Sequence, residues 1–175
     1  MKSLIVAVAA TLLLASAAQA EVTDKSAAGF EVTEKVTVAA PAAKVYAALL
    51  TPAEWWNKDH SWSGSAKNLS VDLAAGCFCE KLPKGFVRHM TVVFADGATT
   101  LRLFGGLGPM QFTGASGHLA FVLKPAGDKT DLTLTYDVGG YAKGGLADKW
   151  AAPVDGVLGE AVGRLKRYVE TGKPD

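Results

Sequence analysis

One segment of helical character lies between a single strand pattern and a long run of further strand patterns. Residues 41–56 read PAAKVYAALLTPAEWW, and each of the two prolines suits the first turn of a helix. Thr51 and Glu54 have the spacing of a capping box, so we expect a second short helix that carries Trp55 and Trp56. Because one strand pattern precedes this segment and several follow it, the sequence predicts a sheet with two short helices inserted after its first strand.

The strand patterns and a long helical pattern define the fold class. Apolar and polar side chains alternate over residues 30–38, and further strand patterns occupy residues 71–73, 77–82, 86–94, 99–104, 118–124 and 131–138. Apolar residues then recur every three or four positions from Leu146 to Val169, which indicates a long helix with a kink or a break at Pro153. We therefore expect an α+β domain in which a mostly antiparallel sheet of about seven strands is covered by a C-terminal helix.

One acidic residue falls on the apolar face of the first strand. Glu34 shares that face with Val32 and Val36. The strand could lie at the edge of the sheet, where a charge prevents pairing with another chain, or Glu34 could point into a cavity as a polar anchor. We favour the edge position.

The first twenty residues have the pattern of a signal peptide. Lys2 is followed by an apolar run over residues 4–15 and by Ala18-Gln19-Ala20, a small-x-small cleavage site. The run is shorter than the roughly 20 apolar residues that a spanning helix needs. We expect cleavage after Ala20, export to the periplasm with no stable membrane span, a flexible N-terminus over residues 21–28 and one domain over residues 29–172.

The charge and the chemistry of the chain exclude several classes of partner. The sequence has 18 basic and 17 acidic residues and no basic run, so it offers no footprint for nucleic acid or anionic lipid. His60, His89, His118 and the two cysteines do not have the spacing of a metal site. The glycine clusters lack the lysine of a phosphate loop. We therefore expect no metal and no cofactor.

The two cysteines, Cys77 and Cys79, are two residues apart in a predicted strand. Their side chains share a face, but in a regular strand the Cβ atoms are farther apart than the ~3.8 Å that a disulfide prefers. We favour two buried thiols. A strained bond between them and a bridge to another chain stay open as alternatives.

The order of these elements resembles the START-like, or SRPBCC, helix-grip superfamily, in particular the bacterial relatives of polyketide cyclases and of heat-shock chaperone ATPase activators. The residues that carry the resemblance are the following: VTVAAP at 36–41, KVYAAL at 44–49, TPAEWW at 51–56, GCFCE at 76–80, VDGVL at 154–158, and Arg164 with Leu165. The resemblance implies an elongated apolar cavity between the concave sheet and the last helix. Small hydrophobic ligands would enter this cavity.

Six residues are the candidate ligand contacts: Trp56, Trp62, His89, Met110, Tyr136 and Trp150. For the tryptophans the alternative is packing in the core, while residues 57–64 form a polar loop that could gate the cavity. His89 shares a strand face with Val87 and Val93 and so points inward, whereas Arg88 points outward. His89 and Tyr136 are also the candidates for acid/base catalysis, although a hydrogen-bonded core histidine is the plainer interpretation.

Three functions are compatible with these residues. The first is an exported binding or carrier protein for a small apolar molecule, which needs no cofactor. The second is an enzyme of the polyketide cyclase type, in which His89 or Tyr136 moves protons on a bound substrate. The third is an interaction domain like the chaperone activators, and the predicted export argues against it because that chaperone lies in the cytosol.

Overall fold

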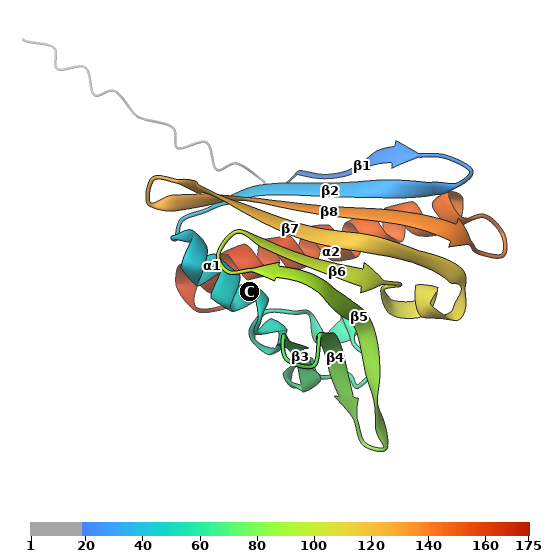
Figure 1. Ribbon diagram of the computed structural model, residues 1–175, viewed down its shortest axis with the longest axis horizontal. Helices are drawn as coiled ribbons and strands as arrows, with labels where there is room; N and C mark the ends of the chain where they lie inside the picture. Colours follow the sequence, from blue (N-terminus) through green and yellow to red (C-terminus); the bar gives the residue numbers. More distant parts are fainter. Residues whose placement is uncertain (1–18) are drawn as a thin grey trace, which may run out of the picture.

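The computed structural model describes residues 19–175, which form one curved antiparallel sheet and two α-helices (Figure 1). The strands are β1 (Gln19–Lys25), β2 (Gly29–Val38), β3 (Leu69–Asp72), β4 (Cys77–Leu82), β5 (Gly85–Asp96), β6 (Thr100–Gly105), β7 (Gly114–Ala126) and β8 (Lys129–Tyr141). The helices are α1 (Ala42–Leu49) and α2 (Leu146–Thr171), with short 3₁₀ helices η1 (Pro52–Glu54), η2 (Lys58–His60), η3 (Ala66–Asn68) and η4 (Gly108–Phe112). The strand order is β1-β2-β8-β7-β6-β5-β4-β3.

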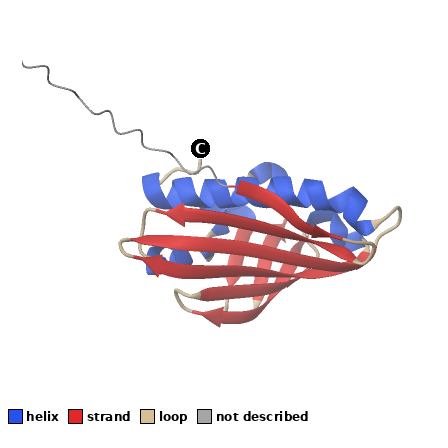
Figure 2. Ribbon diagram, turned by 90° about the horizontal axis from the view of Figure 1, so that it is seen from above, coloured by secondary structure: helices blue, strands red, loops and turns tan. Residues whose placement is uncertain are grey.

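Helix α2 covers one face of the sheet, which confirms the predicted α+β helix-grip arrangement (Figure 2). The helix packs on β1, β2 and β8 through an apolar stripe that includes Val154, Leu158 and Leu165. Pro153 lies inside this helix, so the alternative of two separate helices is wrong. Proline removes one backbone hydrogen bond, and the packing of the flanking apolar residues holds the helix together across it.

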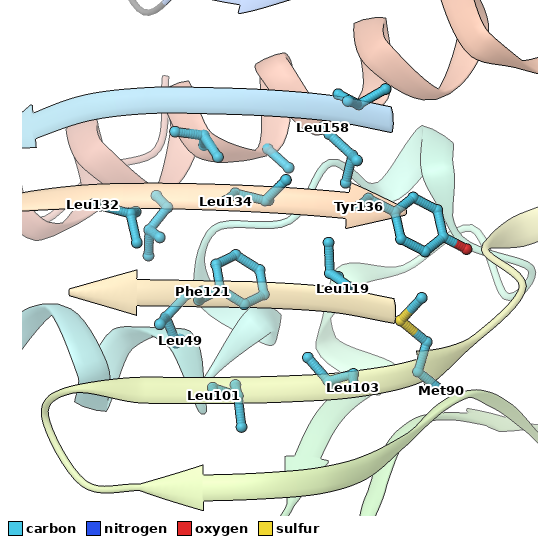
Figure 3. Close-up of a cluster of buried hydrophobic side chains, with 14 of the residues drawn as sticks. Leu49, Met90, Leu101, Leu103, Leu119, Phe121, Leu132, Leu134, Tyr136 and Leu158 are labelled. Carbon is cyan, nitrogen blue, oxygen red and sulfur yellow. The ribbon is translucent and has the colours of Figure 1, made fainter. Parts of the chain in front are cut away.

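The core is built on the pairing of β7 with β8, where the predicted alternation brings apolar residues opposite one another (Figure 3). Leu119 pairs with Tyr136, and Phe121 pairs with Leu134. All four side chains are buried, and each contributes roughly 1.5–3 kcal/mol by leaving water. Leu49 of α1 and Leu158 of α2 join the same cluster, so the two helices and the sheet share one core.

The sheet has eight strands rather than about seven, because residues predicted to be flexible form strand β1. Gln19–Lys25 pairs with β2, in a register that sets Val22 opposite Val32. Within β1, Val22 is flanked by polar residues, so there is no alternation that would have predicted a strand. The predicted signal peptide falls mostly on residues 1–18, outside the described residues, and stays a prediction.

The segment after α1 differs from the expected capped helix. Thr51 donates its hydroxyl hydrogen to the Ala48 carbonyl and does not cap η1, so the predicted capping box is wrong. The chain leaves the 3₁₀ turn after Glu54, and Trp55 and Trp56 are 3% and 8% exposed. Because neighbouring residues of a helix cannot both face straight inward, we expected at least one of them to be partly exposed or to contact the following loop. Trp56 does contact the loop, since its Nε1–H donates to the His60 carbonyl at 3.1 Å. Outside a helix that restriction does not apply.

Cys77 and Cys79 form a disulfide, with their Cα atoms 5.4 Å apart. The expectation of two unpaired thiols is therefore wrong. This Cα distance is shorter than the roughly 6.6 Å that two residues span in a regular strand, and beside this point β5 carries an extra residue, His89. The expectation assumed a regular strand, in which the two side chains would be farther apart. Phe78 lies between the cysteines in sequence and points to the opposite face.

Glu34 is not at an edge, because β2 lies between β1 and β8. Its side chain is fully buried, and neither carboxyl oxygen has a hydrogen-bond partner within residues 19–175. Burial, with a smaller contribution from the Asp155 carboxyl of α2, raises the pKa of Glu34 to about 7. The edge interpretation is therefore wrong, and the second strand of the sheet carries a buried carboxyl under the helix.

Candidate functional site

A cavity of about 390 Å³ opens beside the N-terminal half of α2. Its walls come from the segment after η1, from β3, β4 and β5, from the start of η4 and from α2. The lining residues are Trp56, Asp59, His60, Ser61, Trp62, Leu69, Phe78, His89, Leu107, Gly108, Pro109, Trp150, Pro153, Val154 and Val157. Most of this lining is apolar, and four of the side chains are tryptophan or phenylalanine rings.

One wall is a face of helix α2. Trp150, Pro153, Val154 and Val157 follow one another at intervals of three, one and three residues, so they lie on one side of the helix. Val154 is buried, while Val157 is half-buried and borders the open part of the cavity. The same amphipathic pattern that predicted the helix therefore supplies this wall.

The opposite wall is formed by the last three strands of the sheet. Leu69, Phe78 and His89 come from β3, β4 and β5, which are neighbours in the sheet. The rings of Phe78 and His89 have centroids 5.0 Å apart, and the ring of Trp56 lies 5.6 Å from that of Phe78 in an edge-on arrangement. These three rings form a continuous aromatic surface.

The rim of the cavity is a loop that two carboxylates hold in place. Glu160 of α2 accepts a hydrogen bond from the Asn57 amide at 2.7 Å, and its other oxygen lies 3.0 Å from Nε2 of His60. Glu80 of β4 accepts the backbone N–H groups of Trp62, at 3.0 Å, and of Ser63. The loop is thereby tied to the helix on one side of the cavity and to the sheet on the other.

Glu80 also pairs with His89, whose Nε2 lies 2.9 Å from Oε2 of Glu80. Both side chains are buried, Glu80 completely and His89 to all but 5%. Burial alone would raise the pKa of Glu80, but the hydrogen bonds from Ser63, Trp62 and His89 bring it below its ordinary value. Burial lowers the pKa of His89, although the neighbouring Glu80 acts in the opposite direction. At neutral pH the pair is therefore a carboxylate and a neutral imidazole.

Four of the six candidate residues line the cavity: Trp56, Trp62, His89 and Trp150. The structure places the other two, Met110 and Tyr136, in the core and outside the cavity, both completely buried. The Tyr136 hydroxyl donates to the Gly105 carbonyl at 2.8 Å and accepts the N–H of Leu107 at 3.3 Å. Burial raises the pKa of Tyr136 far above its ordinary value, so this phenol keeps its proton. Alternation along a strand gives the face of a residue but not its depth below the cavity.

The hydroxyl of Tyr136 is expected to act on stability and not on the cavity. Tyr136→Phe removes both hydrogen bonds to the 105–107 turn, which should lower the free energy of unfolding by about 1–2 kcal/mol in urea titrations. Tyr141→Phe, at the exposed end of the same strand, is the matched control and should change it by less than about 0.5 kcal/mol. Equal effects of the two substitutions would contradict this role.

Several site residues were not among the candidates from the sequence. Phe78, Val154 and Val157 carry much of the apolar wall, and Glu80 connects the loop to His89. The helical spacing of Val154 and Val157 with Trp150 was visible in the sequence. The pairing of Glu80 with the loop was not, because it joins segments that meet only through the pairing of β3 with β4.

Within residues 19–175 no cluster of three or more histidine, cysteine, aspartate or glutamate side chains could hold a metal ion. In the same part of the chain, no helix has both the length and the apolar character that crossing a membrane requires.

Comparison with known proteins adds a family and a set of similar folds. The sequence model of the family described as "Polyketide cyclase / dehydrase and lipid transport" matches residues 29–170. None of the curated proteins matches the chain.

Three solved structures illustrate the likeness. The conserved protein of unknown function EF2215 from Enterococcus faecalis has a TM-score of 0.57 at 15% identity, over 89% of this chain and 78% of that one. The Aha1 dimer from Colwellia psychrerythraea has a TM-score of 0.53 at 18% identity, over 82% and 98% of the two chains. DynU16, a protein of the dynemicin biosynthetic locus, has a TM-score of 0.50 at 26% identity, over 82% and 48%. These similarities support the helix-grip fold.

Proposed function

The chain belongs to the polyketide cyclase / dehydrase and lipid transport family, and within it we propose that this protein binds a small apolar molecule in the cavity beside α2. The observation that carries the proposal is the cavity itself. Its volume of about 390 Å³ falls within the roughly 300–1,000 Å³ of small-molecule sites, and its walls are aromatic and aliphatic with few polar groups. A filled core in the same place would leave no such space.

The proposed setting is the periplasm, with the chain acting as an exported carrier. The signal-peptide pattern of residues 1–20 supports export. Cleavage after Ala20 would leave Glu21–Lys25 available for pairing with β2 and would remove the pairs that Gln19 and Ala20 form with Lys35 and Glu34. A disulfide between Cys77 and Cys79 is compatible with an oxidising compartment.

Binding is tested by filling the cavity. Val157→Trp places an indole in the open part of the cavity and should weaken the binding of naphthalene, measured by equilibrium dialysis, at least tenfold. Val93→Trp is the matched control, because Val93 is exposed on β5 and does not line the cavity. Both variants should keep the far-UV circular dichroism of the parent protein. Failure of naphthalene to bind the unmodified protein, or equal binding to Val157→Trp, would contradict the proposal.

A second candidate function is acid/base catalysis on the bound molecule, and the Glu80–His89 pair is the observation that favours it. A neutral imidazole held by a carboxylate in an apolar wall can take a proton from a ligand. For an identified substrate, His89→Ala would then abolish turnover and leave occupancy of the cavity intact. A carrier would instead show no turnover in either form.

A further inference from the structure

One polar group is built into the closed part of the otherwise apolar wall. Asp59, His60 and Ser61 also line the cavity, but they lie on the rim, where Asp59 and His60 are exposed. His89 lies deeper, between the Phe78 ring and the Glu80 carboxylate. Among the lining residues, His89 is therefore the one buried imidazole, carboxyl or hydroxyl side chain that a ligand meets, and the Trp150 N–H is sealed.

The partners of Glu80 determine which nitrogen of His89 carries the hydrogen. Glu80 accepts the N–H groups of Trp62 and Ser63, which can only donate, so its oxygens act as acceptors. Oε2 then also accepts from Nε2 of His89, and Nε2 must bear the hydrogen. In a neutral imidazole with hydrogen on Nε2, Nδ1 is an acceptor.

Nδ1 of His89 is free to meet a ligand. No hydrogen bond within residues 19–175 engages it. The sealed side-chain atoms that lack a partner in this part of the chain belong to Glu34, Tyr46, Trp150 and Asp155, and Nδ1 is not among them. Because His89 lines the cavity and its Nδ1 is neither paired nor sealed, Nδ1 has access to a molecule bound there.

The chemistry of this acceptor discriminates between ligands of similar shape. A hydroxyl group can donate to Nδ1 and satisfy it. An ether of the same size would leave Nδ1 unpaired after water is displaced, which costs about 1–3 kcal/mol. A carboxylate has no hydrogen to donate and would bring a second negative charge close to Glu80, which is unfavourable in an apolar surrounding.

We propose that the cavity selects neutral hydroxylated aromatic molecules over ethers and carboxylates of the same shape, because the ligand hydroxyl donates to Nδ1 of His89. Glu80 is the positioning residue that holds His89 in the required tautomer. This specificity rests on the proposed function, since it concerns ligands of the same cavity. The aromatic walls of Trp56, Phe78 and Trp150 favour a planar ring system for the rest of the ligand.

Three naphthalene derivatives test the proposal at pH 7.5: naphthalen-1-ol, 1-methoxynaphthalene and naphthalene-1-carboxylate. By equilibrium dialysis the alcohol should bind about tenfold more tightly than the ether, and the carboxylate should bind more weakly than either. In His89→Phe the preference for the alcohol should fall to within about twofold, while the ether still binds. His118→Phe, an exposed histidine of β7 outside the cavity, is the matched control and should keep the tenfold preference.

The tautomer has its own readout, which does not depend on a variant at His89. In long-range ¹H–¹⁵N spectra of the unmodified protein, Nδ1 of His89 should show the shift of an unprotonated nitrogen, and Glu80→Gln should shift this signal. A hydrogen on Nδ1 of the unmodified protein would overturn the proposal. Equal binding of the alcohol and the ether would overturn it too, while leaving the proposed binding function intact. If neither naphthalene nor any of its three derivatives binds, the proposed function itself fails and the proposed specificity fails with it.

Discussion

Glu80→Gln is expected to lower the free energy of unfolding at pH 7 by about 3 kcal/mol. The carboxylate receives three hydrogen bonds, from the N–H groups of Trp62 and Ser63 and from Nε2 of His89. An amide has one acceptor oxygen, so its NH₂ group must face at least one of these donors. The loss of a buried hydrogen bond to a charged group and the unsatisfied donor that remains both act against the folded state.

The loss of stability in Glu80→Gln is expected to depend on pH. The pKa of Glu80 is lowered in the folded protein, so the carboxylate stabilises the fold above the ordinary glutamate pKa, and this stability is lost as the pH falls below it. Urea titrations should therefore show a nearly constant deficit of Glu80→Gln at pH 7 and 8, where His89 is neutral in both proteins, and the contribution of the carboxylate should be lost below the ordinary glutamate pKa. Glu54→Gln, an exposed glutamate of η1, is the matched control with an expected change below about 0.5 kcal/mol. A deficit below about 1 kcal/mol at pH 7 would show that the loop is not held by this carboxylate.

Glu34→Gln is expected to do the opposite and stabilise the protein at pH 8 by about 3 kcal/mol. The fully buried carboxyl has no hydrogen-bond partner within the described part of the chain, and its pKa is raised to about 7. The folded state therefore keeps the proton between pH 4.5 and 7, whereas the unfolded state has already released it. Stability should fall as the pH rises through this window, and a shift of this size corresponds to about 3 kcal/mol.

The substitution removes the titrating group and keeps the shape of the side chain. Unfolding free energies of Glu34→Gln and of the unmodified protein should agree near pH 4.5 and separate progressively up to pH 8. Glu54→Gln again serves as the exposed control. A variant that is less stable than the parent at pH 8 would mean that the Glu34 carboxylate has a stabilising partner, in conflict with the structure.

The sequence predicts most of the fold but not the position of Glu34. The alternation on β2, β7 and β8 and the helical spacing on α2 were sufficient for the sheet, the covering helix and the helix-grip resemblance. The predicted edge position of Glu34 was wrong. The sequence of β1 has no alternation that indicates a strand, and the pairing of β1 with β2 places β2 inside the sheet. A strand with mostly polar side chains leaves little trace in a hydrophobic pattern, even though β1 also packs against α2.

The candidate site was predicted in part. Large aromatic residues and one inward histidine were sufficient to select Trp56, Trp62, His89 and Trp150, which line the cavity. Tyr136 was selected by the same reasoning, yet it is completely buried in the core and does not line the cavity. The three-way contact of Glu80 could not be predicted, since it depends on a loop conformation that no local pattern specifies.

The account depends most on the cavity beside α2 being a binding site. The most direct measurement is a native mass spectrum of the protein purified from its own host, recorded beside Val157→Trp prepared in the same way. The account predicts one small neutral molecule bound to the unmodified protein and none on Val157→Trp. The account would be contradicted if both spectra showed only bare protein and Val157→Trp had a higher melting temperature than the unmodified protein. The indole would then be filling a space that no ligand uses.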